Sequence, residues 1–479
     1  MSHGAYHRRV PERPAERPAE RSGSTGDRVH DVLIVGGGPA GSSCAYWLAE
    51  AGWDVAVVEK KRFPREKTCG DGLTPRAVRQ LADMGLEGAL AGAHRFEGLR
   101  AYGFGRDLEM AWPEHPNFPS YGYTITRHDL DRIVADGAAK VGATLWQGTE
   151  AVEPLEPVAP GSAACSAASA GSAGSAGGGM LASCAGAVVR DRATGTTRDV
   201  RARFVVVADG ANSRFGRALG AARDRNDPLG MALRGYYRSP RHDDPMIESH
   251  LDIRDAGGEV IPGYGWIFPL GDGRVNVGVG LLSTDRRWKG VNTTRLMEAF
   301  VAGAPKSWGL GPETCLGPPT GGKLPMGLSV GPRHGGNTLV IGDAGGSINP
   351  FNGEGIAYGY ETGRLAAASV GEALSDDGGD ALARYDRRLH DAYGPYHAVA
   401  KAFVRMISDP RTMQLCVGLG MHSEFLMTQL LRIMANLMRP DALGTAEVGY
   451  RAMLAIADLL PRSAREPLLR GLGAVPAPA

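Results

Sequence analysis

Short apolar runs and helical periodicities alternate along the chain and predict an α/β protein. Apolar runs at residues 32–35 and 55–58 flank a segment, 39–51, whose apolar positions recur three and four residues apart. This is the pattern of a strand–helix–strand unit. Further strands are expected at 144–152, 187–192 and 338–341. From about Ala381 onward the apolar positions keep helical spacing, so a helical C-terminal region is expected.

The segment 261–280, IPGYGWIFPLGDGRVNVGVG, alternates between two faces as a strand does and predicts a hairpin. Its aromatic residues fall two apart and share one face: Tyr264, Trp266 and Phe268. A two-residue turn at Asp272-Gly273 would place the valines of the return strand beside them. Glycines on the other face would leave room for a backbone or a ligand. By itself the pattern fits both a core hairpin and the wall of a binding site.

Composition narrows the classes of function. The 479 residues include 53 Lys or Arg and 52 Asp or Glu, so the net charge of +1 gives no overall attraction to nucleic acid. The six cysteines lack CxxC or His-rich spacing, which indicates neither a metal site nor a disulfide framework. No apolar run is long enough to span a membrane, and the N-terminal residues lack the apolar segment of a signal peptide. We expect a cytoplasmic protein that is dissolved or lies on a membrane surface.

Two stretches of low complexity are expected to lack fixed structure. Residues 1–29 contain the charged, Pro-rich repeat ERPAERPAER, which has too few apolar groups to offset the entropy of ordering. Residues 159–187 are rich in Gly, Ser and Ala and separate two predicted strands, which predicts a flexible loop. Cys165 and Cys184 fall in or beside this loop and are given no role.

Glycines after the first strand carry the first chemical signal, a GxGxxG pattern between a strand and a helix. The first glycine permits a tight turn, the second lets a pyrophosphate approach the helix N-terminus, and the third permits close packing of helix on strand. An acidic residue ends the second strand, where it can accept a hydrogen bond from a ribose hydroxyl. The residues expected to contact a dinucleotide here are Gly36, Gly38, Pro39, Ala40, Gly41, Glu59 and Lys60.

Segments far along the chain predict the rest of the cofactor site. One strand ends at Gly342-Asp343 and a helix begins near Gly353 to Gly355, so an aspartate and a helix N-terminus would meet. Another strand ends at Asp209-Gly210. Arg127, at a helix start, could contact a phosphate or be an ordinary surface arginine. Half-sites about three hundred residues apart suit FAD, held between both ends of a folded body, better than NAD.

These segments resemble a known family. The first strand–helix–strand unit, Asp209-Gly210 and Gly342-Asp343 are similar to the flavoprotein fold shared by aromatic hydroxylases and geranylgeranyl reductases. The hairpin, with Tyr-x-Trp-x-Phe-Pro followed by Gly-x-Gly, resembles the geranylgeranyl reductase branch, as do KTCGDGLTPRAV and NPFNGEGI. The resemblance extends from residue 31 to about residue 460. Within this family the chain resembles most the menaquinone reductases, which saturate one isoprene double bond of the menaquinone side chain.

The resemblance implies a Rossmann-type FAD-binding fold with a β-sheet substrate domain and a helical C-terminal region. It also implies FAD bound non-covalently, a polyprenyl substrate, above all menaquinone, and NAD(P)H, a ferredoxin or another redox protein as electron donor. Cys69 would lie near the flavin as a substrate gate or proton relay. Tyr264, Trp266 and Phe268 would wall the polyprenyl channel, where aromatic faces stabilise a developing cation. Asp71 is a further candidate acid, and the proton donor stays unassigned.

Other functions stay open on the sequence. A reductase of geranylgeranyl diphosphate or of a prenylated lipid would share these motifs, although a diphosphate would require basic residues at the channel mouth. A flavin monooxygenase of the aromatic hydroxylase type would consume oxygen and NAD(P)H together. A flavin-bearing electron-transfer or quinone-binding subunit without enzymatic activity is a third alternative.

The order of these segments predicts the domain boundaries. The last helices could also rest on the inner face of the cell membrane as a peripheral contact, through Leu426, Leu430, Leu431, Met434, Leu437 and Met438 beside Arg432 and Arg439. We expect cofactor-binding segments at 30–110, 125–220 and 331–375, a substrate domain that starts at 111–124 and continues over 221–330, and the helical region at 376–479.

Overall fold

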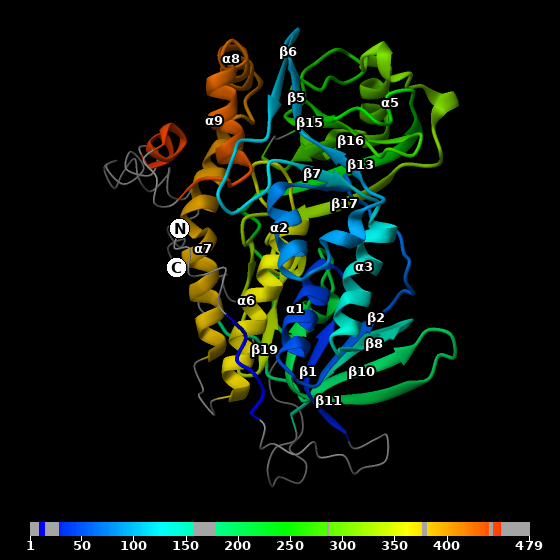
Figure 1. The fold of residues 1–479 in the computed structure, drawn as a ribbon, viewed down its shortest axis with the longest axis vertical. Coiled ribbons are helices and arrows are strands. Elements are labelled where there is room, and N and C mark those ends of the chain that lie inside the picture. Colours follow the sequence, from blue (N-terminus) through cyan, green and yellow to red (C-terminus); the bar gives the residue numbers. More distant parts are fainter. Residues whose placement is uncertain are drawn as a thin grey trace.

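Two large β-sheets flanked by helices form the described part of the protein, in agreement with the α/β prediction. Figure 1 shows the first sheet at the lower end of the molecule, the second at the upper end, and a column of C-terminal helices along one side. The computed structural model describes residues 9–14, 28–157, 179–284, 287–375, 381–439 and 444–451.

The first sheet consists of β1 (Val29–Val35), β2 (Val55–Glu59), β8 (Thr144–Gln147), β9 (Thr149–Leu155), β10 (Gly186–Asp191), β11 (Thr197–Val207) and β19 (Thr338–Val340). Its order is β8-β2-β1-β11-β10-β9, with β19 pairing β11. All pairs are parallel except those that β10 makes with β9 and β11. The central strands are covered on both faces, which is why they are continuous apolar runs.

Glycines bring two helices together over the first sheet. α1 (Pro39–Glu50) packs against α6 (Ile356–Ser375). A Cβ at Gly363 would lie 2.5 Å from the carbonyl oxygen of Ala40, so glycine alone permits this approach. The N-terminus of α1 therefore lies beside the start of α6. The other helices of this body are α2 (Pro75–Asp83), α3 (Arg127–Lys140) and α4 (Arg214–Ala218).

The second sheet has the order β17-β13-β16-β15-β14-β5-β6, and α5 (Thr293–Gly303) packs on it. Its strands are β17 (Thr320–Pro325), β13 (Leu229–Arg238), β16 (Arg274–Leu282), β15 (Gly263–Pro269), β14 (Met246–His250), β5 (Gly98–Gly103) and β6 (Arg106–Ala111). Smaller sheets are formed by β3 (Gly72–Leu73), β7 (Gly122–Thr124) and β4 (His94–Phe96), and by β12 (Ala222–Arg223) and β18 (Val330–Gly331).

The predicted hairpin is β15 and β16, but its predicted two-residue turn is wrong. A backbone hydrogen bond closes a three-residue loop at 271–273. One additional loop residue shifts the pairing by one position and exchanges the faces of the return strand. Trp266 therefore lies opposite Gly278, and not beside the valines. Phe268 lies opposite Asn276. The valines of β16 point to the other face and pack on α5.

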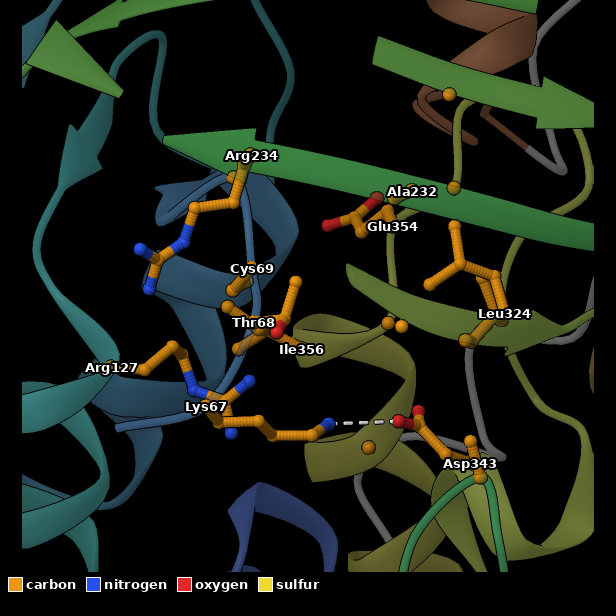
Figure 2. Close-up of a pocket in the computed structure, with 18 of the residues that line it drawn as sticks. Lys67, Thr68, Cys69, Arg127, Ala232, Arg234, Leu324, Asp343, Glu354 and Ile356 are labelled. Carbon is orange, nitrogen blue, oxygen red and sulfur yellow. Dashed lines mark hydrogen bonds and ion pairs between the residues drawn. The ribbon is translucent and has the colours of Figure 1, made fainter. Parts of the chain in front are cut away.

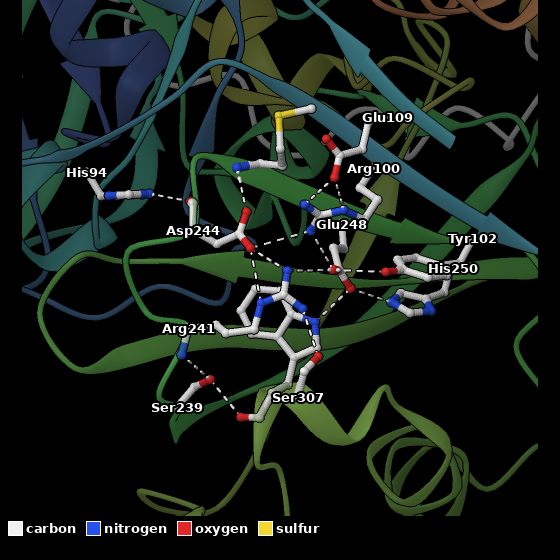
Figure 3. Close-up of polar contacts among 12 residues, drawn as sticks. His94, Arg100, Tyr102, Glu109, Ser239, Arg241, Asp244, Glu248, His250 and Ser307 are labelled. Atoms are coloured by element: carbon white, nitrogen blue, oxygen red, sulfur yellow. Dashed lines mark hydrogen bonds and ion pairs between the residues drawn. The ribbon is translucent and has the colours of Figure 1, made fainter. Parts of the chain in front are cut away.

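A buried ionic cluster lies on the α5 side of the second sheet (Figure 3). Glu248 has no exposed surface, and its carboxylate accepts hydrogen bonds from Arg100 at 2.9 Å and from the Trp308 indole nitrogen at 2.8 Å. The His250 ring nitrogen lies 3.2 Å from the same carboxylate. Because the charge is paired and hydrogen-bonded, its burial is tolerated, and the cluster joins β5 and β14 to the segment beyond α5.

The C-terminal region is helical over its described residues, as expected. It comprises α7 (Ala381–Met406), α8 (Pro410–Gly420) and α9 (Glu424–Met434). In Figure 1, α7 lies along one side of the molecule beside α6, and α9 and α8 continue this side upward beside the β5–β6 hairpin. None of the helices searched within the described residues has the length and apolar character required to cross a membrane.

Parts of both low-complexity stretches are packed, so the expectation that they lack fixed structure is wrong there. Residues 9–14 lie on the first body, where the Trp53 indole donates to the Pro11 carbonyl oxygen at 2.9 Å. At the end of the expected loop, Cys184 is buried, and its backbone nitrogen donates to the Asn337 side chain. A few residues in each stretch make packing contacts, and a prediction from the average composition of the stretch does not detect them. Residues 1–8, 15–27 and 158–178, with Cys165, lie outside the described residues.

Two expected boundaries differ from the structure. The strand expected at 144–152 is divided into β8 and β9 at Gly148, whose φ of +71° produces a bend. β5 and β6, which fall within or at the end of the expected cofactor-binding segment 30–110, pair in the second sheet instead. Residues 98–111 therefore form the last two strands at one side of the second sheet.

Candidate functional site

One cavity of about 1670 Å³ extends between the two sheets and the C-terminal helices. Its lining begins at the glycine turn after β1, passes the loop around Cys69 and the aromatic face of β15, and ends at α8 and α9. A cavity for a single small ligand is roughly 300–1,000 Å³. This cavity therefore has room for a large cofactor and a second molecule together.

The glycine turn has the geometry that a dinucleotide requires. Gly36 has a φ of +107°, and a Cβ at Gly41 would lie 1.9 Å from the Gly36 carbonyl oxygen. A Cβ at Gly38, by contrast, would point into open space, with one Arg65 nitrogen 3.7 Å away. The Glu59 carboxylate is fixed at the end of β2 because it accepts from the Gly37 backbone nitrogen at 3.1 Å. Pro39 and Ala40 begin α1, and both line the cavity, as does Lys60.

The second predicted half-site meets the first across the cavity. Asp343 follows β19 in a 3₁₀ turn, and its carboxylate pairs with Lys67 at 2.9 Å (Figure 2). Gly353 and Gly355 line the cavity immediately before α6 begins at Ile356. The N-termini of α1 and α6 thus both approach the cavity, and each favours negative charge.

Asp209, which ends β11, carries an unsatisfied atom at the cavity wall. Its Oδ2 accepts from the Phe215 backbone nitrogen at 3.1 Å, whereas Oδ1 is buried and has no hydrogen-bond partner among the described residues. Burial raises the pKa of this carboxyl. Gly210 follows with a φ of +83°. A buried oxygen of this kind and the open space at Gly38 both fit an extended FAD molecule, whose hydroxyl and phosphate groups would complete these contacts.

Arg127 lies deeper than a surface arginine. It begins α3, is buried, and its guanidinium binds Asp131 at 2.7 and 2.9 Å. Arg65 pairs with the same carboxylate at 2.9 Å. The interpretation as an ordinary surface residue is therefore wrong. The predicted phosphate contact stays a prediction, because Asp131 already engages the guanidinium.

A hydrogen-bond network joins the cysteine loop to the hairpin. Asn276 of β16 has no exposed surface, and its side-chain nitrogen donates to the Cys69 carbonyl oxygen at 2.9 Å and to Asp71 Oδ2 at 2.8 Å. Its side-chain oxygen accepts from the Trp266 indole nitrogen at 2.9 Å. The Tyr236 hydroxyl donates to the same Asp71 oxygen at 2.6 Å. Cys69 is thus held beside the cavity by groups from both bodies.

The Asp71 carboxyl is held as a hydrogen-bond acceptor. It has no exposed surface, and burial raises its pKa to about 6 although the hydrogen bonds from Tyr236 and Asn276 lower it. The Arg127 backbone nitrogen donates to its other oxygen at 3.3 Å. Its φ of +63° is unusual for a residue with a side chain. Asp71 therefore fixes the loop that presents Cys69.

The predicted aromatic residues all line the cavity. The Tyr264 hydroxyl donates to the Asn352 carbonyl oxygen at 2.6 Å, which ties β15 to the loop before α6. Trp266 lies against the Gly278 backbone, where a Cβ would come within 2.1 Å of the indole ring. Phe268 lies over the cysteine loop, so close that a Cβ at Gly72 would be 3.2 Å from its ring. The rings form a continuous apolar wall.

Sequence reasoning missed several polar residues that the fold brings to this wall. Asn276 stands alone as a polar residue in the run VNVGVG, which was a signal that it serves a specific contact. Glu354 lies between two predicted cofactor glycines and faces the cavity. Lys67, Tyr236 and Arg234 line the same cavity, and no spacing rule relates them to the glycine motifs.

The open space at Gly38 permits a clean test of cofactor binding. Gly38→Val should fold normally, because the new side chain meets no backbone, yet it should abolish FAD binding by filling the pyrophosphate position. The measurement is flavin absorbance per protein chain together with the melting temperature of the apoprotein. Gly92→Val, at a position where a Cβ meets nothing within 4 Å, is the matched control and should keep its flavin. Full flavin content in Gly38→Val would contradict the assignment.

Comparisons with known proteins agree with this geometry. A family described as FAD binding domain matches residues 29–160 and 183–234. A geranylgeranyl bacteriochlorophyll reductase-like protein from Thermoplasma acidophilum has a similar structure, with a TM-score of 0.65 at 23% identity over 93% of this chain and 99% of that one. A flavin-dependent brominase also has a TM-score of 0.65, at 17% identity over 90% of this chain and 99% of its own. These likenesses confirm the predicted fold, and with the family match they confirm FAD as the cofactor.

Similarity in sequence extends over most of the chain. The menaquinone reductase of Mycolicibacterium smegmatis is 41% identical over 416 residues, which cover 86% of this chain and 92% of that protein. Digeranylgeranylglycerophospholipid reductase 1 of Methanopyrus kandleri is 28% identical over 79% of this chain and 91% of its own. The chain therefore belongs to the geranylgeranyl reductase family of FAD-dependent oxidoreductases, among the relatives of the menaquinone reductases.

Proposed function

We propose that this protein uses FAD to reduce one isoprenoid double bond in the polyprenyl side chain of menaquinone. The observation that carries the proposal is one continuous cavity that joins both predicted cofactor half-sites to an apolar chamber. The similarity to menaquinone reductases over 86% of the chain supports the same substrate class.

The apolar chamber suits a neutral chain. The C-terminal helices contribute Phe403, Met413, Val417, Met427, Leu430 and Leu431 to its wall. Within the described residues, none of the side chains that these helices bring to the cavity is charged. A diphosphate would be left without counter-charges at this end. We therefore favour a polyprenyl tail over geranylgeranyl diphosphate.

The residues of the wall perform three tasks in this proposal. When bound, FAD supplies the hydride equivalent, and it would be held by the glycine turn, Asp209 and Asp343. Trp266 and Phe268 exclude water and present aromatic faces to the positive charge that develops on the isoprenoid carbon. The loop at Cys69, which Asn276 holds by a hydrogen bond, lines the same cavity and would act as a gate for the substrate. Desolvation strengthens each of these electrostatic contributions.

The alternatives have less support. A flavin monooxygenase and a flavin-dependent brominase share the fold alone, at identities below 20%. The relatives that match over most of the chain are reductases. An electron-transfer subunit without enzymatic activity would not require a chamber for a polyprenyl tail beside the flavin.

The chamber lies under the most exposed apolar residues of the C-terminal helices. Leu415 on α8 and Phe425 and Leu426 on α9 are each more than half exposed, whereas other residues of the same helices line the chamber. Each helix thus has one face on the substrate and one on the outside. We propose that the outward face rests on the bilayer from which the substrate enters. Leu431 and Leu437, assigned to this surface from the sequence, are buried instead.

Cellular quinones test the substrate directly. Loss of the gene should deplete the menaquinone species whose side chain has one saturated isoprene unit. Menaquinone with two fewer hydrogen atoms should accumulate in its place, while other prenyl lipids keep their masses. Mass spectrometry of lipid extracts, with the gene restored as the control, is the measurement. An unchanged menaquinone profile with altered prenyl lipids would transfer the proposal to those lipids.

Two substitutions of Trp266 separate the role of its ring face from the role of its N–H group. Trp266→Leu removes both, and oxidation of pre-reduced enzyme by menaquinone should slow by tenfold or more, about 1.4 kcal/mol of barrier. Trp266→Phe keeps an aromatic face but loses the bond to Asn276, and should stay within about threefold of the wild-type rate if the face dominates. Flavin content and melting temperature serve as controls. Equal losses in both variants would assign the effect to the hydrogen bond.

Membrane contact can be tested with exposed residues alone. The double variant Phe425→Ser and Leu426→Ser should bind lipid vesicles more weakly and turn over menaquinone in vesicles more slowly, because apolar area is lost from the docking face. Its rate with detergent-dispersed substrate should be unchanged. Val29→Ser, at an equally exposed valine that begins β1 at the other end of the molecule, is the control. Wild-type vesicle binding by the double variant would remove α9 from the contact.

A further inference from the structure

A buried carboxyl group lies in the cavity wall next to the aromatic residues. Glu354 belongs to the loop before α6, between two glycines that line the cavity. Its Oε1 accepts a hydrogen bond from the hydroxyl of Thr74, the residue that precedes α2. Its Oε2 is buried and has no hydrogen-bond partner among the described residues. Figure 2 shows the carboxyl group turned toward the side of the cavity on which Cys69 and Arg234 lie.

The surroundings of Glu354 favour its protonated form. The cation of this region, Arg76, is bound by both oxygens of Glu361 at 2.7 Å, so its charge is already neutralised. Burial raises the pKa of Glu354 to about 7, against smaller lowering effects of Thr74 and Arg76. The ionisable groups around it are Arg76 on α2, Tyr358 and Glu361 on α6, Tyr396 on α7, and Tyr264 on β15.

Other acids of the cavity are less suitable donors. Both oxygens of Asp71 already accept hydrogen bonds, and all of its donors favour the ionised form. The Tyr264 hydroxyl donates to a backbone carbonyl oxygen, and burial raises the pKa of this phenol further above its ordinary value. Glu354 alone among these acids combines a free oxygen with a site beside the aromatic wall.

We propose that Glu354 is the catalytic acid that protonates the isoprenoid double bond. The π bond breaks, a C–H bond forms with the proton from Oε2, and the second C–H bond forms with the hydride equivalent that the reduced cofactor supplies. The alkene gains two electrons and two hydrogens, and the cofactor is oxidised. Glu354 is left as a carboxylate that regains its proton from water. The inference rests on isoprenoid reduction as the proposed function, but it does not depend on which polyprenyl lipid is bound.

The test compares Glu354→Gln with the wild type in two half-reactions. Glutamine keeps the size of the side chain and an oxygen that accepts from Thr74, but it cannot donate the proton. Flavin content, melting temperature and flavin reduction by dithionite should be unchanged. Oxidation of the reduced enzyme by menaquinone or by geranylgeraniol should fall by roughly 100-fold or more. The wild-type rate should fall as pH rises through about 7, because the acid must be protonated, and Glu354→Gln should lose this limb.

Thr74→Val is the matched control for a structural role. It removes the hydroxyl that binds Glu354 but leaves the acid in place, so its rate should fall by less than tenfold. Equal losses in Thr74→Val and Glu354→Gln would show that the carboxyl group only holds the loop, and would overturn the proposal. A Glu354→Gln rate within about threefold of wild type, with the pH limb retained, would overturn it as well.

A spectroscopic measurement keeps the proposal testable without turnover. The infrared band of a protonated carboxylic acid should disappear as the wild-type protein is titrated through about pH 7, and the band should be missing from Glu354→Gln. If Glu354→Gln loses its flavin, Glu354→Asp should keep a shifted band and some activity. An unshifted band in Glu354→Asp, or a band retained in Glu354→Gln, would overturn the assignment. Wild-type inactivity toward both lipids, with the band present, would count against the proposed function and not against the buried acid.

Discussion

The site depends on one buried asparagine. Asn276 belongs to the second sheet, yet its side chain donates to the cysteine loop of the first body and accepts from Trp266 of the neighbouring strand. A buried amide without these partners would cost roughly 1 to 3 kcal/mol. The network therefore stabilises a single arrangement of the two bodies, and it fixes the aromatic wall and the loop at Cys69 relative to each other.

Glycine at two positions is the second constraint on the structure, because the backbone there must be approached closely by a ring or by another helix. Gly278 lets the Trp266 indole lie on the β16 backbone, so the ring is buried and still borders the cavity. Gly363 lets α6 approach α1, which brings two segments about three hundred residues apart to the same cavity. Sheet pairing alone would not produce either approach. The shape of the cavity thus depends on these glycines as much as on its polar residues.

Local pattern predicted the features that depend on neighbours in sequence. The glycine turn, the start of α6 and the shared face of Tyr264, Trp266 and Phe268 follow from spacings of two to four residues. The register of the hairpin did not follow, because a single loop residue decides it and the run LGDGR permits two turn lengths.

Contacts between distant segments were the other limit of sequence reasoning. Asn276 has two partners in the cysteine loop that lie more than two hundred residues away, and no spacing rule relates them to it. Glu354 was hidden for a different reason. Its neighbours are glycines that were predicted to bind the cofactor, so the acid between them was interpreted as part of a turn. Burial in the folded cavity gives the carboxyl group its chemical character, and burial is a property of the whole fold.

The same apolar surroundings serve binding and chemistry. Aliphatic side chains from α8 and α9 make the chamber favourable for a polyprenyl tail, and water that they exclude no longer solvates the charges within it. Exclusion of water keeps a carboxyl group protonated near neutral pH and increases the attraction between an aromatic face and a developing cation. In the reaction proposed above, polar substitutions in this wall would therefore weaken substrate binding and proton delivery together, even at positions that touch neither Glu354 nor Trp266.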